Sequence, residues 1–530
     1  MNRFFVVVGI VVFIVMGLLS LKTYIFIRTC VQDGKTFVHH VQNPTIPLTQ
    51  AEFEYTHYRF SLCKQTFDSY IKVSRQLPWK IPYTAELSEG AKIIQSWLPF
   101  LPNILGLYDE RHYIVLLQNN TELRPTGGFI GSYLSITTRD GHVQDIHIED
   151  IYTPDGQLKG YVEPPKPIAK FLFQEGGWRL RDANWDPDFP SSAQQIAWFF
   201  ERGGYPQLDG VGAVTLSTIR ELLKETGDVY VPDYDKVVSA DTIYSFIQSE
   251  VEQDFFPGSS KKKDVLDAIF RSFLRSLERF PREKQVRMFK TILSGFQSRD
   301  IQLWMRDLDQ QRNVEVFGWD GSVRKRMCLL TSCLSDYLYL VEANVGINKA
   351  NCCIDRTVDY DVWLNQDKTA TASLILRYTN HNPSTPQPPK YYGGGYKNYL
   401  RIYTDEKNTV FRASDNLNKE IAVEEEKEKH QGLRVYSSLL TIDGGEQRDI
   451  TYTFSLGDWV MDAQKNTYQL FIQKQSGVLP SDYTIRLHVP DSVRIVLNES
   501  DTNVRRLQDG IEKHMKVAQD TLLTFTTKKE

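Results

Sequence analysis

The feature that most constrains this chain is an uncharged apolar run near its amino terminus. Residues Phe4 to Leu21 read FFVVVGIVVFIVMGLLSL and contain no charged side chain. Together with the mostly apolar continuation to Ile27, the run is long enough to cross a bilayer core of about 30 Å as a helix. We therefore expect residues 4–27 to form one transmembrane anchor.

A cleaved signal peptide is the alternative interpretation of this run. No small-residue cleavage site follows it, and Cys30 lacks the small neighbours that a lipoprotein cysteine requires. Arg3 precedes the run, whereas Lys22 and Arg28 follow it, so charge alone leaves the orientation open. Because only a short arm precedes the run, we expect a single-pass protein of the cytoplasmic membrane with most of the chain outside the cytoplasm.

The composition is that of a packed globular protein. The chain has 530 residues, of which 41% are hydrophobic and 24% are charged, and this predicts about three domains. Lys and Arg number 62 and Asp and Glu 66, which gives a net charge of −4. Because this balance does not favour an anionic partner for the whole molecule, we expect no nucleic-acid binding.

Three regions follow the expected anchor. Residues 28–110 contain two helix-like stretches and are expected to form a helical stalk. Residues 111–320 alternate short strands and helices, which predicts an α/β domain with a mixed sheet and flanking helices. Residues 336–530 contain regularly spaced strand patterns, which predict an antiparallel β-sandwich domain.

Local patterns predict individual elements of these domains. Asp140-Gly141 predicts a hairpin turn, and Ser191 or Ser192 is expected to cap a helix. A strand, a helix and a second strand are expected between Asp209 and Val231. The strands expected in the sandwich are Tyr337–Ala343, Arg356–Trp363, Thr369–Tyr378, Leu400–Thr404, Leu433–Leu440, Arg448–Ser455, Gln469–Gln475, Thr484–His488 and Leu522–Thr526.

Four sequence blocks resemble a known family. They are QNNTELRPTGGFIGSY at Gln118 to Tyr133, RDANWDPDFPSSA at Arg181 to Ala193, VEANVGINK at Val341 to Lys349 and YQLFIQKQSG at Tyr468 to Gly477. These blocks are similar to the bacterial membrane-anchored proteins of the domain of unknown function 4012 family. The resemblance extends from about Tyr113 to Val489, with an apparent insertion at Arg324 to Ser335. It implies a fold and membrane attachment but no activity.

A more distant similarity implies chemistry. A strand, a polar loop with an arginine, a hairpin and an Asp/Arg-rich loop follow one another as in the LytR-CpsA-Psr phosphotransferases, envelope enzymes that move lipid-pyrophosphate-linked glycopolymers onto the wall. The charged residues of the two loops supply candidates for such chemistry: Arg124, Arg179 and Arg181 to bind the substrate phosphates, and Asp182 and Asp188 as catalytic carboxylates. Asp182 and Asp186 would then be ligands of a Mg²⁺ ion.

Each of these residues also has a structural interpretation. Arg124 could pair internally with Glu122 or an aspartate, and Asp186-Pro187-Asp188 could form a rigid turn in which Asp188 accepts backbone hydrogen bonds. Three tryptophans nearby could offer aromatic faces to a sugar or a polyprenyl chain, or could belong to the core. They are Trp178, Trp185 and Trp198.

Six cysteines suit an exported domain in an oxidising compartment. Cys328, Cys333, Cys352 and Cys353 lie in one short window, and their spacing is not a usual zinc pattern. A disulfide between a loop and the strand that follows it is therefore expected, although the sequence leaves the connectivity open.

Two functions of different class fit the sequence. The first is a bacterial cell-envelope protein of unknown function that binds a wall polymer or another envelope protein. The second is a phosphotransferase similar to the LytR-CpsA-Psr group, acting with Mg²⁺ on a polyprenyl-phosphate-linked glycan. The transferase requires the Arg124 loop and the Arg181 to Asp188 loop to converge on one open cleft, whereas the binding protein predicts that these side chains are paired or dispersed.

Overall fold

The structure is a computed structural model, and it covers most of the chain after the expected anchor. Among these residues, no helix is both long and apolar enough to cross a membrane. The expected anchor at residues 4–27 lies outside the described residues. The residues that the structure describes are 29, 32–33, 35–37, 39–40, 48–74, 84–172, 176–252, 261–277, 280–326, 328, 332–385, 393–426, 430, 432–459, 466–497 and 503–529.

The α/β domain is built on one mixed sheet, as the sequence predicted. The strand order is β3-β2-β1-β4-β7, in which only β1 and β4 are parallel. The strands are β1 Arg111–Asn119, β2 Phe129–Arg139, β3 His142–Asp150, β4 Gly210–Thr215 and β7 Ile301–Met305.

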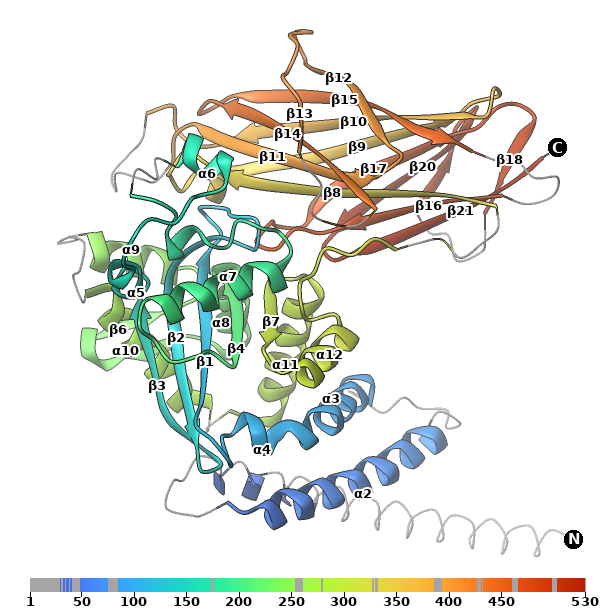
Figure 1. Cartoon of the computed structure of the whole chain (residues 1–530). Coiled ribbons are helices and arrows are strands. Elements are labelled where there is room, and N and C mark those ends of the chain that lie inside the picture. Colours follow the sequence, from blue (N-terminus) through green and yellow to red (C-terminus); the bar gives the residue numbers. More distant parts are fainter. Residues whose placement is uncertain are drawn as a thin grey trace, which may run out of the picture.

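The β2–β3 hairpin turns at Asp140-Gly141, as expected. Asp140 has φ 55° and Gly141 has φ 80°, so both residues adopt the positive φ that a two-residue hairpin turn requires. The turn packs against the preceding helical region, where Asp140 N donates to Gly106 O at 2.8 Å. That region comprises α2 Gln50–Ser74, α3 Thr84–Trp97, η1 Leu98–Phe100 and α4 Leu101–Ile104, and it lies at the hairpin end of the sheet (Figure 1).

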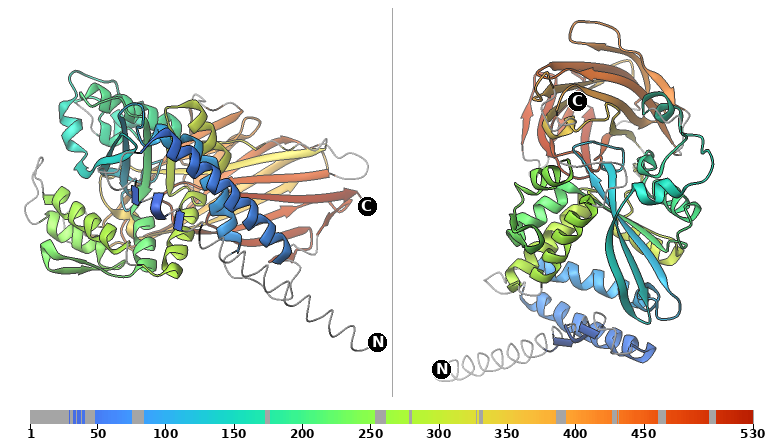
Figure 2. Two further views of the ribbon diagram at one scale, coloured as in Figure 1. Left: turned by 90° about the horizontal axis from the view of Figure 1, so that it is seen from below. Right: turned by 90° about the vertical axis from the view of Figure 1, so that its left-hand side faces the viewer.

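Helices flank both faces of this sheet (Figures 1 and 2). Apolar side chains of α7 Phe189–Arg202, including Phe189 and Phe200, form one core with the sheet. The other face is covered by α8 Leu216–Thr226 and α11 Arg282–Gln297. The remaining elements are α5 Tyr152–Gln157, α6 Lys166–Phe171, η2 Leu180–Asp182, β5 Val229–Val231, η3 Pro232–Tyr234, β6 Lys236–Val238, α9 Ile243–Glu252, α10 Lys261–Leu277 and α12 Leu308–Phe317.

The strand, helix and second strand expected between Asp209 and Val231 are present as β4, α8 and β5, although β5 pairs antiparallel with β6 in a separate two-stranded sheet. The expected helix cap was wrong. α7 begins at Phe189, and its N-cap is Asp188 rather than Ser191 or Ser192. The Asp188 carboxylate accepts hydrogen bonds from both Ser191 N and Ser191 Oγ, so the aspartate competes successfully with the serines for the cap.

The second domain is a sandwich of two seven-stranded sheets (Figure 1). One has the order β12-β15-β10-β9-β17-β20-β19 and the other β13-β14-β11-β8-β16-β21-β18. The sheets enclose one large apolar core that includes Tyr360, Leu374, Leu400 and Phe454. The elements are β8 Cys333–Asn344, η4 Ala350–Cys353, β9 Ile354–Leu364, β10 Thr369–Asn380, β11 Tyr396–Asp405, β12 Thr409–Asp415, β13 Glu424–Glu426, β14 Leu433–Ile442, β15 Gln447–Asp458, β16 Asn466–Gln473, β17 Ser481–His488, β18 Val493–Val496, β19 Val504–Arg506, β20 Gly510–Val517 and β21 Thr521–Lys529.

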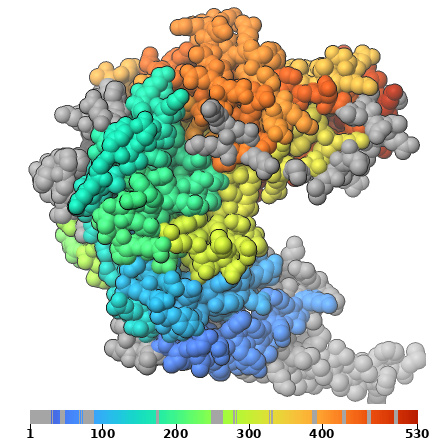
Figure 3. All heavy atoms as spheres, viewed as in Figure 1, coloured from blue at the N-terminus to red at the C-terminus, as the bar shows by residue number. Residues whose placement is uncertain are grey.

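All nine strands expected in this domain are present, but the sheets are not purely antiparallel. β16 pairs parallel with β8, and β17 pairs parallel with β9. The expectation of an antiparallel sandwich is therefore corrected to one with a parallel pair in each sheet. In the space-filling view of Figure 3, the teal and green α/β domain lies directly against the orange sandwich.

Candidate functional site

All four of the sequence blocks have residues where the two domains meet. The loop after β1 carries the first block, and its Leu123 O accepts a hydrogen bond from Asn344 N of the third block at 3.0 Å. Gln475 Nε2 of the fourth block donates to Arg124 O at 3.3 Å. Asn120 Nδ2 donates to Gly477 O at 2.9 Å. The blocks therefore form a hydrogen-bonded junction between the α/β domain and the sandwich.

Arg124 lies at the centre of this junction and is only 2% exposed. Its Nη2 is 2.9 Å from Glu122 Oε1, and its Nε is 3.4 Å from Asp182 Oδ1. Its Nη1 donates to Asn344 O at 2.8 Å, which ties the guanidinium to the sandwich. The loops of Arg124 and Asp182 thus converge, but in a buried network in which their charges pair with each other.

Arg181 extends the same network. Its Nη1 is 2.5 Å from Asp155 Oδ2, and its guanidinium lies over the Tyr152 ring. Burial raises the pKa of both Glu122 and Asp155, although the neighbouring arginines oppose this effect. We call Glu122, Arg124, Asp155, Arg181 and Asp182 the junction cluster.

Asp188 and Asp186 serve the turn that leads into α7. Asp188 caps the helix, and its Oδ1 also accepts a hydrogen bond from Val323 N at 2.9 Å. Asp186 Oδ1 accepts from Asp188 N at 3.0 Å and lies 3.6 Å from His430 Nε2 of the sandwich. Arg179 is half-exposed, and its Nη2 lies close to Gly176.

The aspartates of the expected magnesium site contact different partners. Asp182 belongs to the junction cluster, whereas Asp186 contacts Asp188 and His430. Among the residues that the structure describes, no group of three or more His, Cys, Asp or Glu side chains is arranged to hold a metal ion. A Mg²⁺ site at these aspartates stays a prediction.

Among the residues that the structure describes on both sides of the bond, cysteines form two local disulfides. Cys328 bonds to Cys333, the first residue of β8, which is the expected link between a loop and the following strand. Cys352 bonds to its neighbour Cys353 within η4. The second pair therefore does not bridge to the first.

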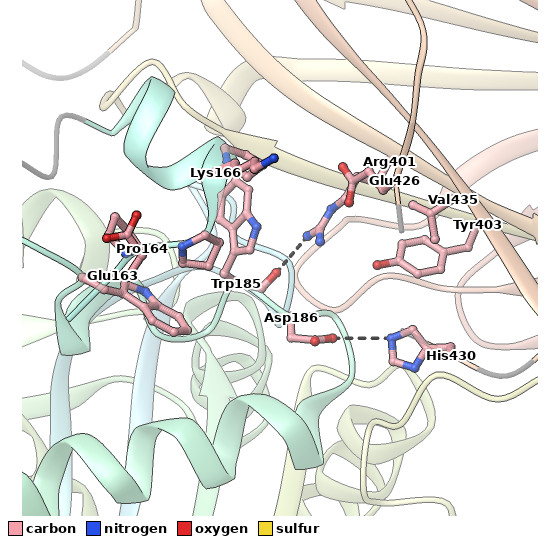
Figure 4. Close-up of a pocket in the computed structure, with 13 residues that line it drawn as sticks. Glu163, Pro164, Lys166, Trp185, Asp186, Arg401, Tyr403, Glu426, His430 and Val435 are labelled. Carbon is pink, nitrogen blue, oxygen red and sulfur yellow. Dashed lines mark hydrogen bonds and ion pairs between the residues drawn. The ribbon is translucent and has the colours of Figure 1, made fainter. Parts of the chain in front are cut away.

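Beside the junction cluster, a pocket of about 410 Å³ opens between the two domains (Figure 4). Its volume falls in the range of about 300 to 1,000 Å³ that is typical of small-molecule sites. The lining from the α/β domain comprises Glu163, Pro164, Pro165, Lys166, Pro167, Trp178, Trp185 and Asp186, and that from the sandwich Arg401, Tyr403, Glu426, His430 and Val435.

Stacked aromatic groups form part of the pocket wall. Arg401 lies over the Trp185 ring at 5.2 Å, and Trp185 stacks on Tyr399 at 5.9 Å between ring centroids. Arg401 Nη2 also donates to Trp185 O at 2.8 Å, as the dashed line in Figure 4 marks. Trp178 makes an edge-to-face contact with Phe199, and part of its ring lines the pocket.

The sequence located only one wall of this pocket. Trp178, Trp185 and Asp186 were candidates, whereas Arg401 and His430 were not. Trp198, the third tryptophan considered, does not line the pocket and is 36% exposed. Since more than 200 residues separate Trp185 from Arg401 in the sequence, no local pattern could indicate that they meet.

Comparison with solved structures gives only weak likenesses. The M1 zinc metallopeptidase of Deinococcus radiodurans is 14% identical over 33% of this chain and 42% of that chain, with a TM-score of 0.19. The leukotriene A4 hydrolase of Saccharomyces cerevisiae is 9% identical over 33% of this chain and 29% of that chain, with a TM-score of 0.22. This chain thus spans less than half of either enzyme. With TM-scores this low, neither likeness is evidence of a shared fold or function.

A putative nutrient binding protein of Legionella pneumophila is 8% identical over 36% of this chain and 70% of that chain, with a TM-score of 0.24. No curated protein matches this chain. Residues 109–251, which include the Arg124 loop and the turn into α7, match the model of a family described as protein of unknown function, DUF4012. The resemblance to the domain of unknown function 4012 family is thereby confirmed, and the chain carries a DUF4012 region at residues 109–251.

Proposed function

We propose that this chain is a membrane-anchored protein of a bacterial cell envelope that binds a glycan segment of a wall polymer in the pocket between its domains. The observation that carries the proposal is the composition of that pocket. Trp178, which is half-buried, offers aromatic surface to it, whereas Trp185 is held between Arg401 and Tyr399 and forms the wall; carboxylates, an arginine and a lysine complete the lining. Aromatic faces pack on the apolar faces of sugar rings, and charged side chains hydrogen-bond sugar hydroxyls.

The apolar run at residues 4–27 supports attachment to the membrane. Two disulfides in the described part of the chain support a location in an oxidising compartment. Both features agree with a binding domain held outside the cytoplasmic membrane, where wall polymers occur.

The phosphotransferase alternative gains no support from the junction cluster. That alternative requires Arg124 to reach a pyrophosphate, yet Arg124 is buried and pairs with Glu122 and Asp182. Asp188 caps a helix, so its carboxylate is already engaged. These contacts favour binding over transfer.

The test uses two tryptophans that contact the same phenylalanine, although Trp178 Nε1 also donates to Asp182 O at 3.2 Å, so the unfolding midpoints of both variants are compared with the wild type. Trp178 and Trp198 both contact the edge of Phe199, at 5.6 and 5.1 Å, but only Trp178 lines the pocket. The full chain in detergent micelles is mixed with insoluble wall sacculi, and the bound fraction is measured by sedimentation. We expect Trp178→Ala to weaken binding about tenfold, since stacking contributes about 1 kcal/mol or more, and Trp198→Ala to leave it unchanged. Equal effects of the two variants, or no binding by the wild type, would contradict the proposal.

A further inference from the structure

The carboxylates that line the pocket have hydrogen-bond partners within the protein, whereas Arg401 has a donor without an acceptor among the described residues. Arg401 is only 4% exposed, and a guanidinium carries five N–H donors. The Trp185 carbonyl accepts one of these, while the Nε is buried without an acceptor in the described part of the chain. Arg401 has no ion pair among the described residues.

Arg401 remains charged in this setting. Burial by itself lowers the pKa of Arg401, but Tyr403, Glu426 and Asp186 outweigh that effect and raise it. The cation is therefore permanent. Glu426 and Asp186 compensate its burial at longer range, but among the described residues neither forms a direct ion pair with it. Lys166 at the rim is exposed and likewise has no partner among the described residues.

The carboxylates of the same pocket are already engaged. Glu426 Oε1 accepts a hydrogen bond from Tyr399 OH at 2.5 Å. Asp186 accepts from Asp188 N and contacts His430. Glu163 lies near the largely exposed Tyr161, whose pKa it raises. With His430 neutral, the lining holds three carboxylates and two cations, a net charge of −1. The hydrogen-bond donor of Arg401 that lacks an acceptor among the described residues, rather than the net charge, therefore indicates what the pocket lacks.

From this imbalance we infer that the ligand of the pocket carries an anionic group beside a sugar ring, and that Arg401 binds that group. The shared chemistry is a carboxylate or a phosphate, either of which matches the planar fork of a guanidinium. Lys166 attracts the same group from the rim. This inference rests on the proposed glycan binding and names the class of sugar, an acidic saccharide.

The test compares sugars that differ in one group. N-acetylmuramic acid carries a carboxylate that N-acetylglucosamine lacks, and N-acetylglucosamine 1-phosphate carries a phosphate instead. Binding of each to the full chain in detergent is measured by calorimetry at low salt. We expect one acidic sugar to bind at least about tenfold more tightly than the neutral one, as a charge-assisted hydrogen bond predicts. The better acidic sugar identifies the anion.

Three variants locate the anion site. Arg401→Met should abolish the preference, and Arg401→Lys should reduce it because the charge stays while the fork is lost. Lys166→Ala should weaken acidic binding about two- to fivefold, since exposed charges contribute little. The matched control is Lys170→Ala, which removes an exposed lysine of α6 that packs over Phe171 outside the pocket.

Several results would overturn the inference while leaving the proposed function intact. They are equal binding of neutral and acidic sugars, a preference that survives in folded Arg401→Met, or no binding of any probe while sedimentation with sacculi persists. If Arg401→Met fails to fold, as thermal unfolding would reveal, Arg401→Lys and Lys166→Ala decide the outcome. Loss of sedimentation by the wild type would instead overturn the proposed function itself.

Discussion

Two arginines in this molecule are almost equally buried but differ in their partners. Arg124, in the junction cluster, is 2% exposed and pairs with Glu122 and Asp182. Arg401, in the pocket, is 4% exposed and donates to a single carbonyl oxygen. Both were brought to the boundary between the domains by the fold.

This difference separates a structural cation from a binding cation. Burial of a charge costs free energy unless hydrogen bonds and an opposite charge compensate. In Arg124 the protein itself supplies the compensation and uses it to join two domains. Arg401 receives longer-range compensation from Glu426 and Asp186, but among the described residues it has no direct ion pair and donates to one carbonyl oxygen, so a ligand is the natural source of a direct anionic partner. The partners of a buried charge are therefore more informative about function than its burial or its position in a sequence motif.

The largest expected effect comes from replacing each arginine by methionine. Arg124→Met leaves Glu122 buried without its cation and leaves Asp182 with only the more distant Arg181 at 3.8 Å, so we expect the free energy of unfolding to fall by about 3 to 5 kcal/mol. Arg401→Met strands no carboxylate, so we expect a change of about 1 kcal/mol or less. Urea unfolding of the full chain in detergent, followed by fluorescence, measures both. Equal losses in the two variants would break the comparison.

The second effect concerns how closely the domains approach at the junction. A Cβ on Gly477 would lie 1.9 Å from Gly127 O, and Gly477 has φ 78°. Gly457 has almost the same φ, 77°, but a Cβ there would lie 3.8 Å from Lys407 Cβ, its nearest neighbour. Alanine at either position introduces the same backbone strain, and only Gly477→Ala also introduces a clash.

We therefore expect Gly477→Ala to be less stable than Gly457→Ala by about 1 to 3 kcal/mol. The measurement is the midpoint of thermal unfolding for the two variants side by side. Similar midpoints would mean that the junction accommodates the added methyl group at little cost. The Arg124 region would then not be a rigid link between the domains.

The third prediction concerns Asp186 and Asp188, which lie in the turn between the junction cluster and the pocket. Asp188→Ala removes the α7 cap and the acceptor of Val323 N, so we expect a loss of about 1 to 2 kcal/mol. Asp186→Asn keeps an acceptor for Asp188 N and should change stability by about 0.5 kcal/mol or less. Unfolding and sacculus binding are both measured. A catalytic Asp188 would show the reverse, a stable variant that has lost activity.

The sequence predicted the scaffold better than the site. Alternating side chains located all nine expected sandwich strands, and Asp140-Gly141 located the hairpin, because these signals are local. The parallel pairing of β8 with β16 was not predicted, since it depends on a crossover of more than 100 residues. The pocket was missed for the same reason. Trp185 and Arg401 become neighbours only after both domains have folded and docked.

The smallest expected effect is a pH dependence that sharpens the distinction between paired and unpaired groups. Burial raises the pKa of Glu122 despite the neighbouring charge of Arg124. The Glu122 carboxyl therefore binds its proton more tightly in the folded state than in the unfolded chain, where the pKa of a glutamate is about 4.3. The Glu122 contribution to stability is fully present below that pH and declines as the pH rises through the raised value in the folded state.

Glu122→Gln removes this titration while keeping an oxygen that can accept a hydrogen bond from Arg124. We expect the wild type to lose stability relative to the variant between about pH 4 and pH 7. Urea unfolding of both proteins across this range measures the difference. A wild type that instead gains stability relative to the variant over the same range would mean that Arg124 more than offsets the burial of Glu122. The pairing in the junction cluster would then be stronger than the structure indicates, and the contrast with Arg401 would be larger.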